Sequence, residues 1–159
     1  MNIVARYLDR RDIVLDLNVA EKTDALEAIA AHFARHHGIE KTTISSALIR
    51  REKSGSTAVG HGLAIPHARI AGIDQPLVML ARTGLPIKFG APDHHPVSVL
   101  LAIVVPERAN DEHLEILGNV AAMFASETFR AQLAHAGNSD TVFRLLAEWH
   151  ESGNDANGV

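Results

Sequence analysis

Three polar side chains lie where the sequence predicts the edge of a hydrophobic core. His67 follows the apolar residues 63–65 and a proline. Arg51 lies one turn beyond the apolar stripe of a predicted helix, and His113 falls in the first turn of another predicted helix, on its apolar face. Each position also has an ordinary explanation: a turn residue, a cation near the free carbonyl groups of a helix end, or a hydrogen-bonded histidine.

Together the three residue types fit phosphoryl transfer. A neutral imidazole is a nucleophile near pH 7, provided that its other ring nitrogen keeps its proton. A backbone carbonyl at a rigid turn would hold that proton, and Pro66 with the glycines at 60 and 62 could form the turn. The phosphorylated product carries about two negative charges. Arg51 would offer a bidentate guanidinium, and His113 a donor at the positive end of a helix dipole.

The hydrophobic pattern predicts the elements that must position these side chains. Helices are expected over 23–38, 42–55, 111–125, 126–136 and 139–151, and strands over 12–17, 57–65, 75–83 and 95–106. Residues 84–96 are rich in Pro, Gly and Asp and predict a loop or hairpin. In the second helix the apolar stripe leads to Arg51, so Glu52 and Lys53 are expected to point to solvent. The alternation predicts an α/β single domain with a central mixed, partly parallel sheet flanked by helices on both faces.

Composition narrows the class of protein. The 159 residues are 47% hydrophobic but only 4% aromatic, and the net charge is −4, so one aliphatic core is expected and nucleic-acid binding is not. The longest apolar run, 97–105, is too short to span a membrane, and the N-terminus does not read as a signal peptide. A cytoplasmic protein without membrane insertion is expected, with a disordered tail over 152–159.

Other kinds of site find less support. His32, His36 and His37 have partial metal-ligand spacing on a helix but lack the glutamate of an HExxH motif. The sequence has no cysteine, no GxSxG elbow and no GxxxxGK[ST] loop. We therefore expect no metal and no cofactor, and we expect a phosphoryl group to come from a phosphoprotein and not from ATP. Whether the chain counts as an enzyme is left open.

Two segments, "RREKSGSTAVGHGLAIPHAR" and "EHLEIL", carry a family resemblance. They resemble the enzyme IIA domains of the fructose/mannitol class in the bacterial phosphotransferase system, above all the stand-alone nitrogen-regulatory members. The resemblance implies a domain of this type over residues 1–151. It also implies that His67 is phosphorylated by a small HPr-like phosphocarrier protein, and that Arg51 and His113 support the phosphohistidine.

The chain departs from the family's usual pattern in three places. Ala68 stands where glycine usually follows the active histidine, Ala58 replaces a common glycine, and "GHG" replaces "GNG" or "GQG". Ala68 matters most, because alanine adopts a positive φ far less readily than glycine.

The resemblance leaves several functions open. The favoured one is a regulatory phosphocarrier of the nitrogen branch, whose targets would include potassium-transport or sensor-kinase proteins. The alternative is a sugar-specific enzyme IIA that passes phosphate to a fructose or mannitol permease; a binding module with a relic site and a histidine-metal hydrolase are further alternatives. Leu63, Ile65 and Ile87 are the predicted docking residues, and the oligomeric state is left open.

Overall fold

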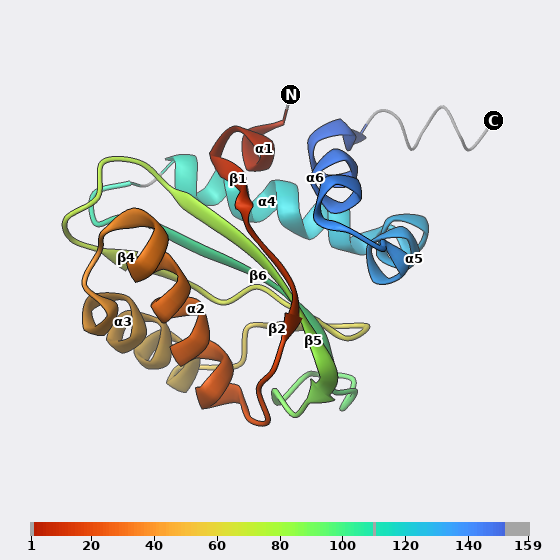
Figure 1. The fold of residues 1–159 in the computed structure, drawn as a ribbon, viewed down its shortest axis with the longest axis horizontal. Coiled ribbons are helices and arrows are strands. Elements are labelled where there is room, and N and C mark those ends of the chain that lie inside the picture. Colours follow the sequence, from red (N-terminus) through yellow and green to blue (C-terminus); the bar gives the residue numbers. More distant parts are fainter. Residues whose placement is uncertain (1, 110, 152–159) are drawn as a thin grey trace.

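The computed structural model describes residues 2–109 and 111–151. The helices are α1 (Ile3–Tyr7), α2 (Lys22–His37), α3 (Lys41–Lys53), α4 (Asp111–Ala125), α5 (Glu127–His135) and α6 (Ser139–Glu148). The strands are β1 (Leu8–Leu17), β2 (Ala58–Gly60), β3 (Leu63–Ala64), β4 (His67–Ile70), β5 (Leu77–Ile87) and β6 (Val97–Pro106). Figure 1 shows how they are arranged around one sheet.

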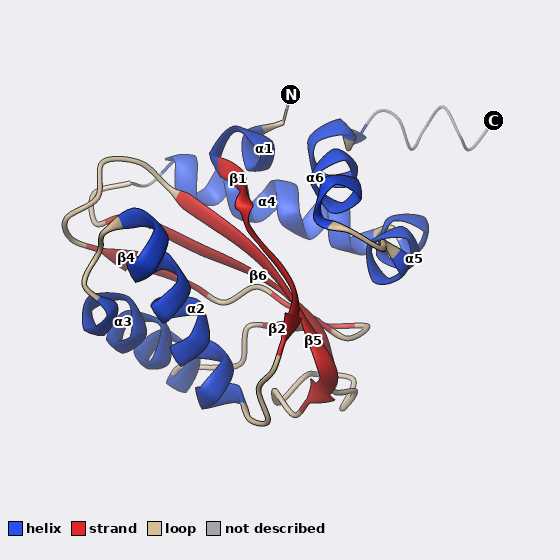
Figure 2. Ribbon diagram, in the orientation of Figure 1, coloured by secondary structure: helices blue, strands red, loops and turns tan. Residues whose placement is uncertain are grey.

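All six strands belong to one sheet, in the order β1-β5-β6-β3-β2, with β4 also paired to β6. Strand β1 runs parallel to β5, and both β3 and β4 run parallel to β6. The β5–β6 and β2–β3 pairs are antiparallel. Helices α2 and α3 cover one face of this sheet, and α1, α4, α5 and α6 cover the other (Figure 2). The predicted fold class, a mixed and partly parallel sheet between helices, is confirmed.

Strand β6 is buried on both faces, which explains why it is apolar almost throughout. Its alternate side chains enter different cores, because successive residues of a strand point to opposite faces. Leu101 and Ile103 pack with the helices of the α4–α6 side. Leu100 and Val104 pack with α2 and α3. The strand therefore joins the two hydrophobic cores and forms the rigid centre of the fold.

Several predicted boundaries shift. The strand expected over 57–65 divides into β2 and β3, because the chain turns at His61 and Gly62, both with positive φ. The predicted hairpin is confirmed, although β5 continues as far as Ile87. Residues 152–159, expected to form a tail, lie outside the described residues. In the described part of the chain, every helix is too short or too polar to cross a bilayer.

Candidate functional site around His67

His67 is the first residue of β4 and not a turn residue after a strand. Its backbone pairs with Ile103 of β6, and the Ile103 amide donates to the Pro66 carbonyl at 2.9 Å. The His67 Nδ1 atom lies 2.7 Å from the Ile65 carbonyl oxygen. Because a carbonyl can only accept, Nδ1 carries the proton when this bond forms, and Nε2 of the neutral ring keeps its lone pair. The sheet and the Ile65 carbonyl together fix the tautomer that phosphoryl acceptance at Nε2 needs.

The electrostatic surroundings keep this imidazole neutral. Burial lowers the pKa of His67 below its usual value, and the positive charge of Arg51 lowers it further. The hydrogen bond to Ile65 and the charge of Glu52 act in the opposite direction. The net lowering leaves the ring unprotonated at neutral pH, which is the form able to attack an electrophile.

His113 lies against His67. It is the third residue of α4, it is 8% exposed, and its ring centroid lies 5.6 Å from that of His67 with the planes at 79°. Burial lowers its pKa, and the charges of His67 and Arg69 lower it further. Its Nδ1 is buried without a hydrogen-bond partner among the described residues. A buried ring nitrogen left unpaired is costly, so this atom keeps a hydrogen-bonding capacity that no described residue uses.

Arg51 lies in the last turn of α3, half-buried at the edge of the apolar stripe as predicted. Its Nη1 donates to the Gly55 carbonyl at 2.8 Å, in the loop that follows the helix. The structure thus brings the two histidines into ring contact. It also brings the Arg51 charge close enough to act on the pKa of His67.

Glu52 is buried, so the prediction that it points to solvent is wrong. Its side chain is 4% exposed and accepts from the Thr57 amide at 2.8 Å, the Thr57 hydroxyl at 2.6 Å and the Lys22 ammonium at 2.9 Å. The helical pattern missed this because the chain after α3 folds back over its last turn and supplies the partners. Lys53, the other residue expected in solvent, is exposed. The sequence signal that could have indicated this burial is Thr57, a hydrogen-bond donor five residues after the glutamate and beyond a Ser-Gly turn.

Ala68 is compatible with the site. It lies in β4 opposite Val104 and is 7% exposed. Among the described residues, positive φ outside glycine occurs at His61 and His94, with values of 57° and 62°, and Ala68 is not among them. The backbone after His67 is ordinary strand, which alanine adopts without strain.

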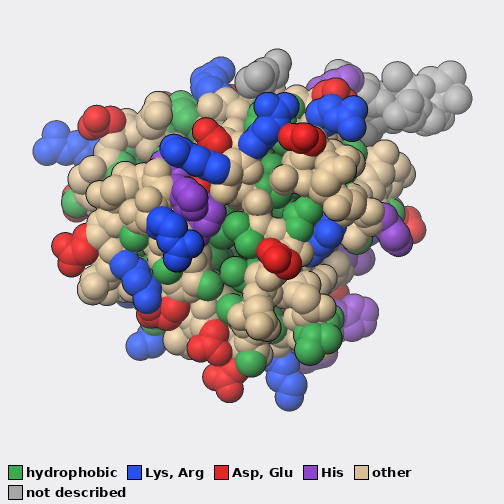
Figure 3. Space-filling model, viewed as in Figure 1, with side chains coloured by type: hydrophobic (Ala, Val, Ile, Leu, Met, Phe, Trp, Pro, Cys, Tyr) green, Lys and Arg blue, Asp and Glu red, His purple; other side chains and the backbone are tan. Residues whose placement is uncertain are grey.

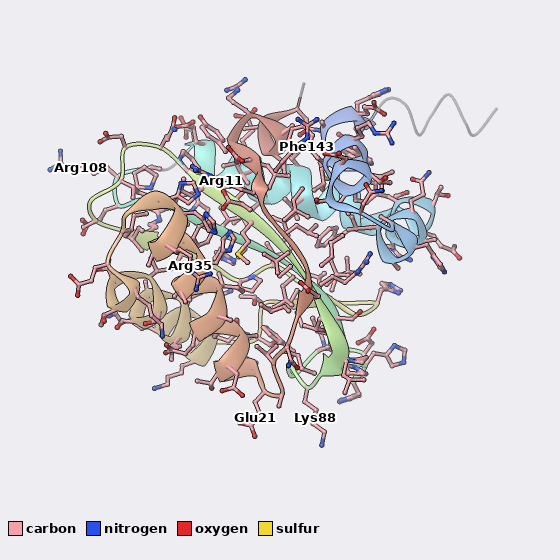
Figure 4. All side chains as sticks on the ribbon, in the orientation of Figure 1. Arg11, Glu21, Arg35, Lys88, Arg108 and Phe143 are labelled. Carbon is pink, nitrogen blue, oxygen red and sulfur yellow. The ribbon has the colours of Figure 1, made fainter. Side chains whose placement is uncertain are left out.

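The histidines with metal-ligand spacing are engaged in another way. His32 and His37 place their Nε2 atoms 2.9 and 2.8 Å from the two carboxylate oxygens of the buried Asp12 on β1. Figure 3 shows histidine and basic side chains together on the surface over α2, and Figure 4 places Arg11 and Arg35 on this same face. Within residues 2–109 and 111–151, no group of three or more histidine or acidic side chains could hold a metal ion. The contacts of His32 and His37 with Asp12 join α2 to β1.

The predicted docking residues are wrong. Leu63, Ile65 and Ile87 are 3%, 5% and 2% exposed and belong to the core. A short apolar run beside a functional residue does not distinguish a strand interior from a surface. Among the described residues, the large exposed hydrophobic side chains are Val59, Leu85 and Leu114. Leu114 directly follows His113.

Comparisons with known proteins find relatives over most of the chain. The family model described as "Phosphoenolpyruvate-dependent sugar phosphotransferase system, EIIA 2" matches residues 6–149. A nitrogen regulatory protein of Pseudomonas aeruginosa is 37% identical over 128 residues, 80% of this chain and 83% of that protein. A fructose-specific EIIA component of Haloferax volcanii is 37% identical over 102 residues, 64% and 66% of the two chains. The crystal structure of nitrogen regulatory protein IIA-Ntr from Neisseria meningitidis has a TM-score of 0.87 and 35% identity, with 91% of this chain and 99% of that chain covered.

Proposed function

The chain belongs to the EIIA type-2 family of the phosphoenolpyruvate-dependent sugar phosphotransferase system, and we propose that it is a regulatory phosphocarrier of the nitrogen branch. It accepts a phosphoryl group on His67 from an HPr-like phosphocarrier protein. Its phosphorylation state then controls its binding to other proteins in the cytoplasm, such as potassium-transport or sensor-kinase proteins. The observation that carries the proposal is the 2.7 Å contact between His67 Nδ1 and the Ile65 carbonyl, which keeps the proton on Nδ1 and leaves the Nε2 lone pair available.

The chemistry requires no group beyond the two proteins. The Nε2 lone pair of His67 attacks the phosphorus of the donor's phosphohistidine, one P–N bond forms and the donor's P–N bond breaks. The proton stays on Nδ1, hydrogen-bonded to the Ile65 carbonyl oxygen, and the donor imidazole leaves with the electron pair of the broken bond. Arg51 and His113 are proposed to stabilise the negative charge that moves onto this ring. The first turn of α4, where His113 lies, adds the positive end of the helix dipole.

Labelling tests the assignment of His67. Incubation with an HPr-like carrier, phosphorylated with labelled phosphate, should give one acid-labile phosphoryl group per chain. His67→Ala should take up none, whereas His61→Ala, an exposed histidine in the same stretch, should label as the unaltered chain does. Label that persists in His67→Ala would rule out this histidine as the acceptor.

The regulatory role is preferred to a sugar-specific one. Relatives described as nitrogen regulatory proteins are 31–37% identical over about 80% of the chain, and the fructose-specific relative supports the alternative over a shorter span. The phosphorylated chain should transfer its label poorly to the EIIB domain of a fructose or mannitol permease. Affinity capture with free and phosphorylated protein should recover different partners. Rapid transfer to such a domain would favour the sugar-specific role.

A further inference from the structure

Glu52 lies beside the site. Apart from the effect of its charge on the pKa of His67, it has no role in the proposed phosphoryl transfer. It is a carboxylate in the last turn of α3, 7% exposed as a residue, and it accepts three hydrogen bonds. Taking a carboxylate out of water is unfavourable unless its oxygens are paired. Here two of the three donors come from Thr57, so the carboxylate holds the loop 54–57 in place. The third, from Lys22 of α2, balances the charge.

The loop that Glu52 fixes is connected to both groups of the site. On one side, the Gly55 carbonyl accepts from the Arg51 guanidinium at 2.8 Å. On the other side, the Thr57 carbonyl accepts from the Ile65 amide at 2.9 Å, and the Ile65 carbonyl holds His67 Nδ1 at 2.7 Å. The position of the loop therefore determines where the arginine charge and the imidazole lie relative to one another.

We propose that Glu52 is a positioning residue, which holds Arg51 and His67 in register for phosphoryl transfer by fixing the loop 54–57 through Thr57. The inference rests on the proposed function of His67. Glu52 itself does not touch the phosphoryl group. Its effect passes through the loop, by one hydrogen bond to Arg51 and by two, through Ile65, to His67.

The loop would survive the loss of Glu52, which makes the proposal testable. The Ser56 hydroxyl donates to the Phe89 carbonyl at 2.6 Å and accepts from the Ala58 amide at 3.1 Å. These bonds anchor the loop to the neighbouring segment independently of Glu52. Glu52→Gln keeps the shape of the side chain but removes its charge. Its amide oxygen can replace Oε2 as the acceptor for the Thr57 amide and Lys22, but its NH2 group is a donor and cannot accept from the Thr57 hydroxyl as Oε1 does.

The first experiment compares Glu52→Gln with Asp12→Asn. Asp12 is also a buried, hydrogen-bonded carboxylate, but it lies on β1, which β5 and β6 separate from β4, the strand that holds His67. Phosphorylation from the labelled carrier should be slowed at least about tenfold in Glu52→Gln and less than twofold in Asp12→Asn. Equal slowing in the two variants at matched melting temperatures would overturn the proposal.

The second readout is the pKa of His67, followed by the ring-proton resonances in an NMR titration without any carrier. The charges that act on it are those of Arg51 and Glu52, and the ring of His113 lies against it. Removing the Glu52 charge should by itself lower this pKa further, so Thr57→Val, which keeps that charge, is titrated as well. Displacement of the imidazole should shift the His67 pKa in Thr57→Val too, whereas a general loss of stability would leave it unchanged. A slow Glu52→Gln with an unshifted His67 pKa would show that Glu52 is merely structural. Since the titration needs no carrier, it tests the inference even if the unaltered chain took up no label, an outcome that would instead refute the proposed function.

Thr57 provides a second route if Glu52→Gln does not fold. Thr57→Val removes the hydroxyl that Glu52 accepts from and leaves the backbone amide bond in place. It should slow labelling severalfold, and Thr57→Ser, which restores the hydroxyl, should recover the rate. No slowing in Thr57→Val, or slowing in Thr57→Ser as large as in Thr57→Val, would contradict the proposed connection.

Discussion

Replacing Ala68 by glycine tests whether the backbone after His67 needs the freedom that glycine gives. In the structure Ala68 lies in β4 without a positive φ and buries its methyl group. Glycine costs about 0.5–1 kcal/mol relative to alanine in a strand, and the lost methyl group costs about 0.8 kcal/mol more. We expect the variant to be destabilised by about 1–2 kcal/mol. For a domain of this size that corresponds to a fall in melting temperature of about 3–7 °C.

A matched substitution in the same stretch should have the opposite sign. His61 has a φ of 57° between two glycines of positive φ. His61→Gly relieves a left-handed conformation that costs about 1–2 kcal/mol, and the greater freedom of the unfolded chain takes back about 0.5–1 kcal/mol. The expected result is a stability change between zero and about 1.5 kcal/mol in favour of the variant.

Thermal and urea unfolding measure the stability of the two variants, and labelling of His67 measures their function. Both variants should accept phosphate within about twofold of the unaltered chain, because neither side chain supports the imidazole. A more stable Ala68→Gly would show that the strand is strained at this position and that the alanine is tolerated only at a cost. A strongly destabilised His61→Gly would contradict the analysis of the turn.

Three further outcomes are expected. The pKa values of His32, His67 and His113 are all lowered by burial, so the unfolded chain binds these protons more readily. The free energy of unfolding should therefore be constant above about pH 6.5 and decline toward pH 5, by at most about 1.4 kcal/mol per pH unit for each histidine. Urea unfolding at several pH values measures this free energy. Greater stability at pH 5 would contradict the lowered pKa values. Arg51→Met should slow labelling of His67 by about 100-fold and raise the pKa of His67, and an unchanged rate in stopped-flow labelling would make Arg51 purely structural. Arg82→Met should cost about 1.5–3 kcal/mol in urea unfolding, because the Arg82 guanidinium donates to three carbonyl groups at the end of α5, and a loss under 0.5 kcal/mol would show that water replaces these bonds.

The helical periodicity predicted the local setting of two site residues well. Arg51 follows the apolar stripe of α3 by one turn, and His113 shares the buried face of α4. Both statements depend only on neighbours within one helix, which a period of 3.6 residues encodes.

Features that depend on distant partners were not predictable in this way. Glu52 is buried only because the loop after α3 returns to it and Lys22 of α2 reaches it. Asp12 accepts from two histidines on another element. A charged residue at a helix end looks the same in sequence whether water or a folded-back loop surrounds it.

The attachment of His67 to β6 has a consequence for how partners meet this protein. The imidazole belongs to a strand that is paired with β6 from His67 through Ile70. The backbone of His67 can therefore be displaced only if this strand pair separates. Amide exchange at Ile103 should accordingly follow global unfolding. An incoming protein finds a target that is already ordered, and the association loses little conformational entropy at this residue. Encounters can then be weak and short while the geometry for transfer is retained.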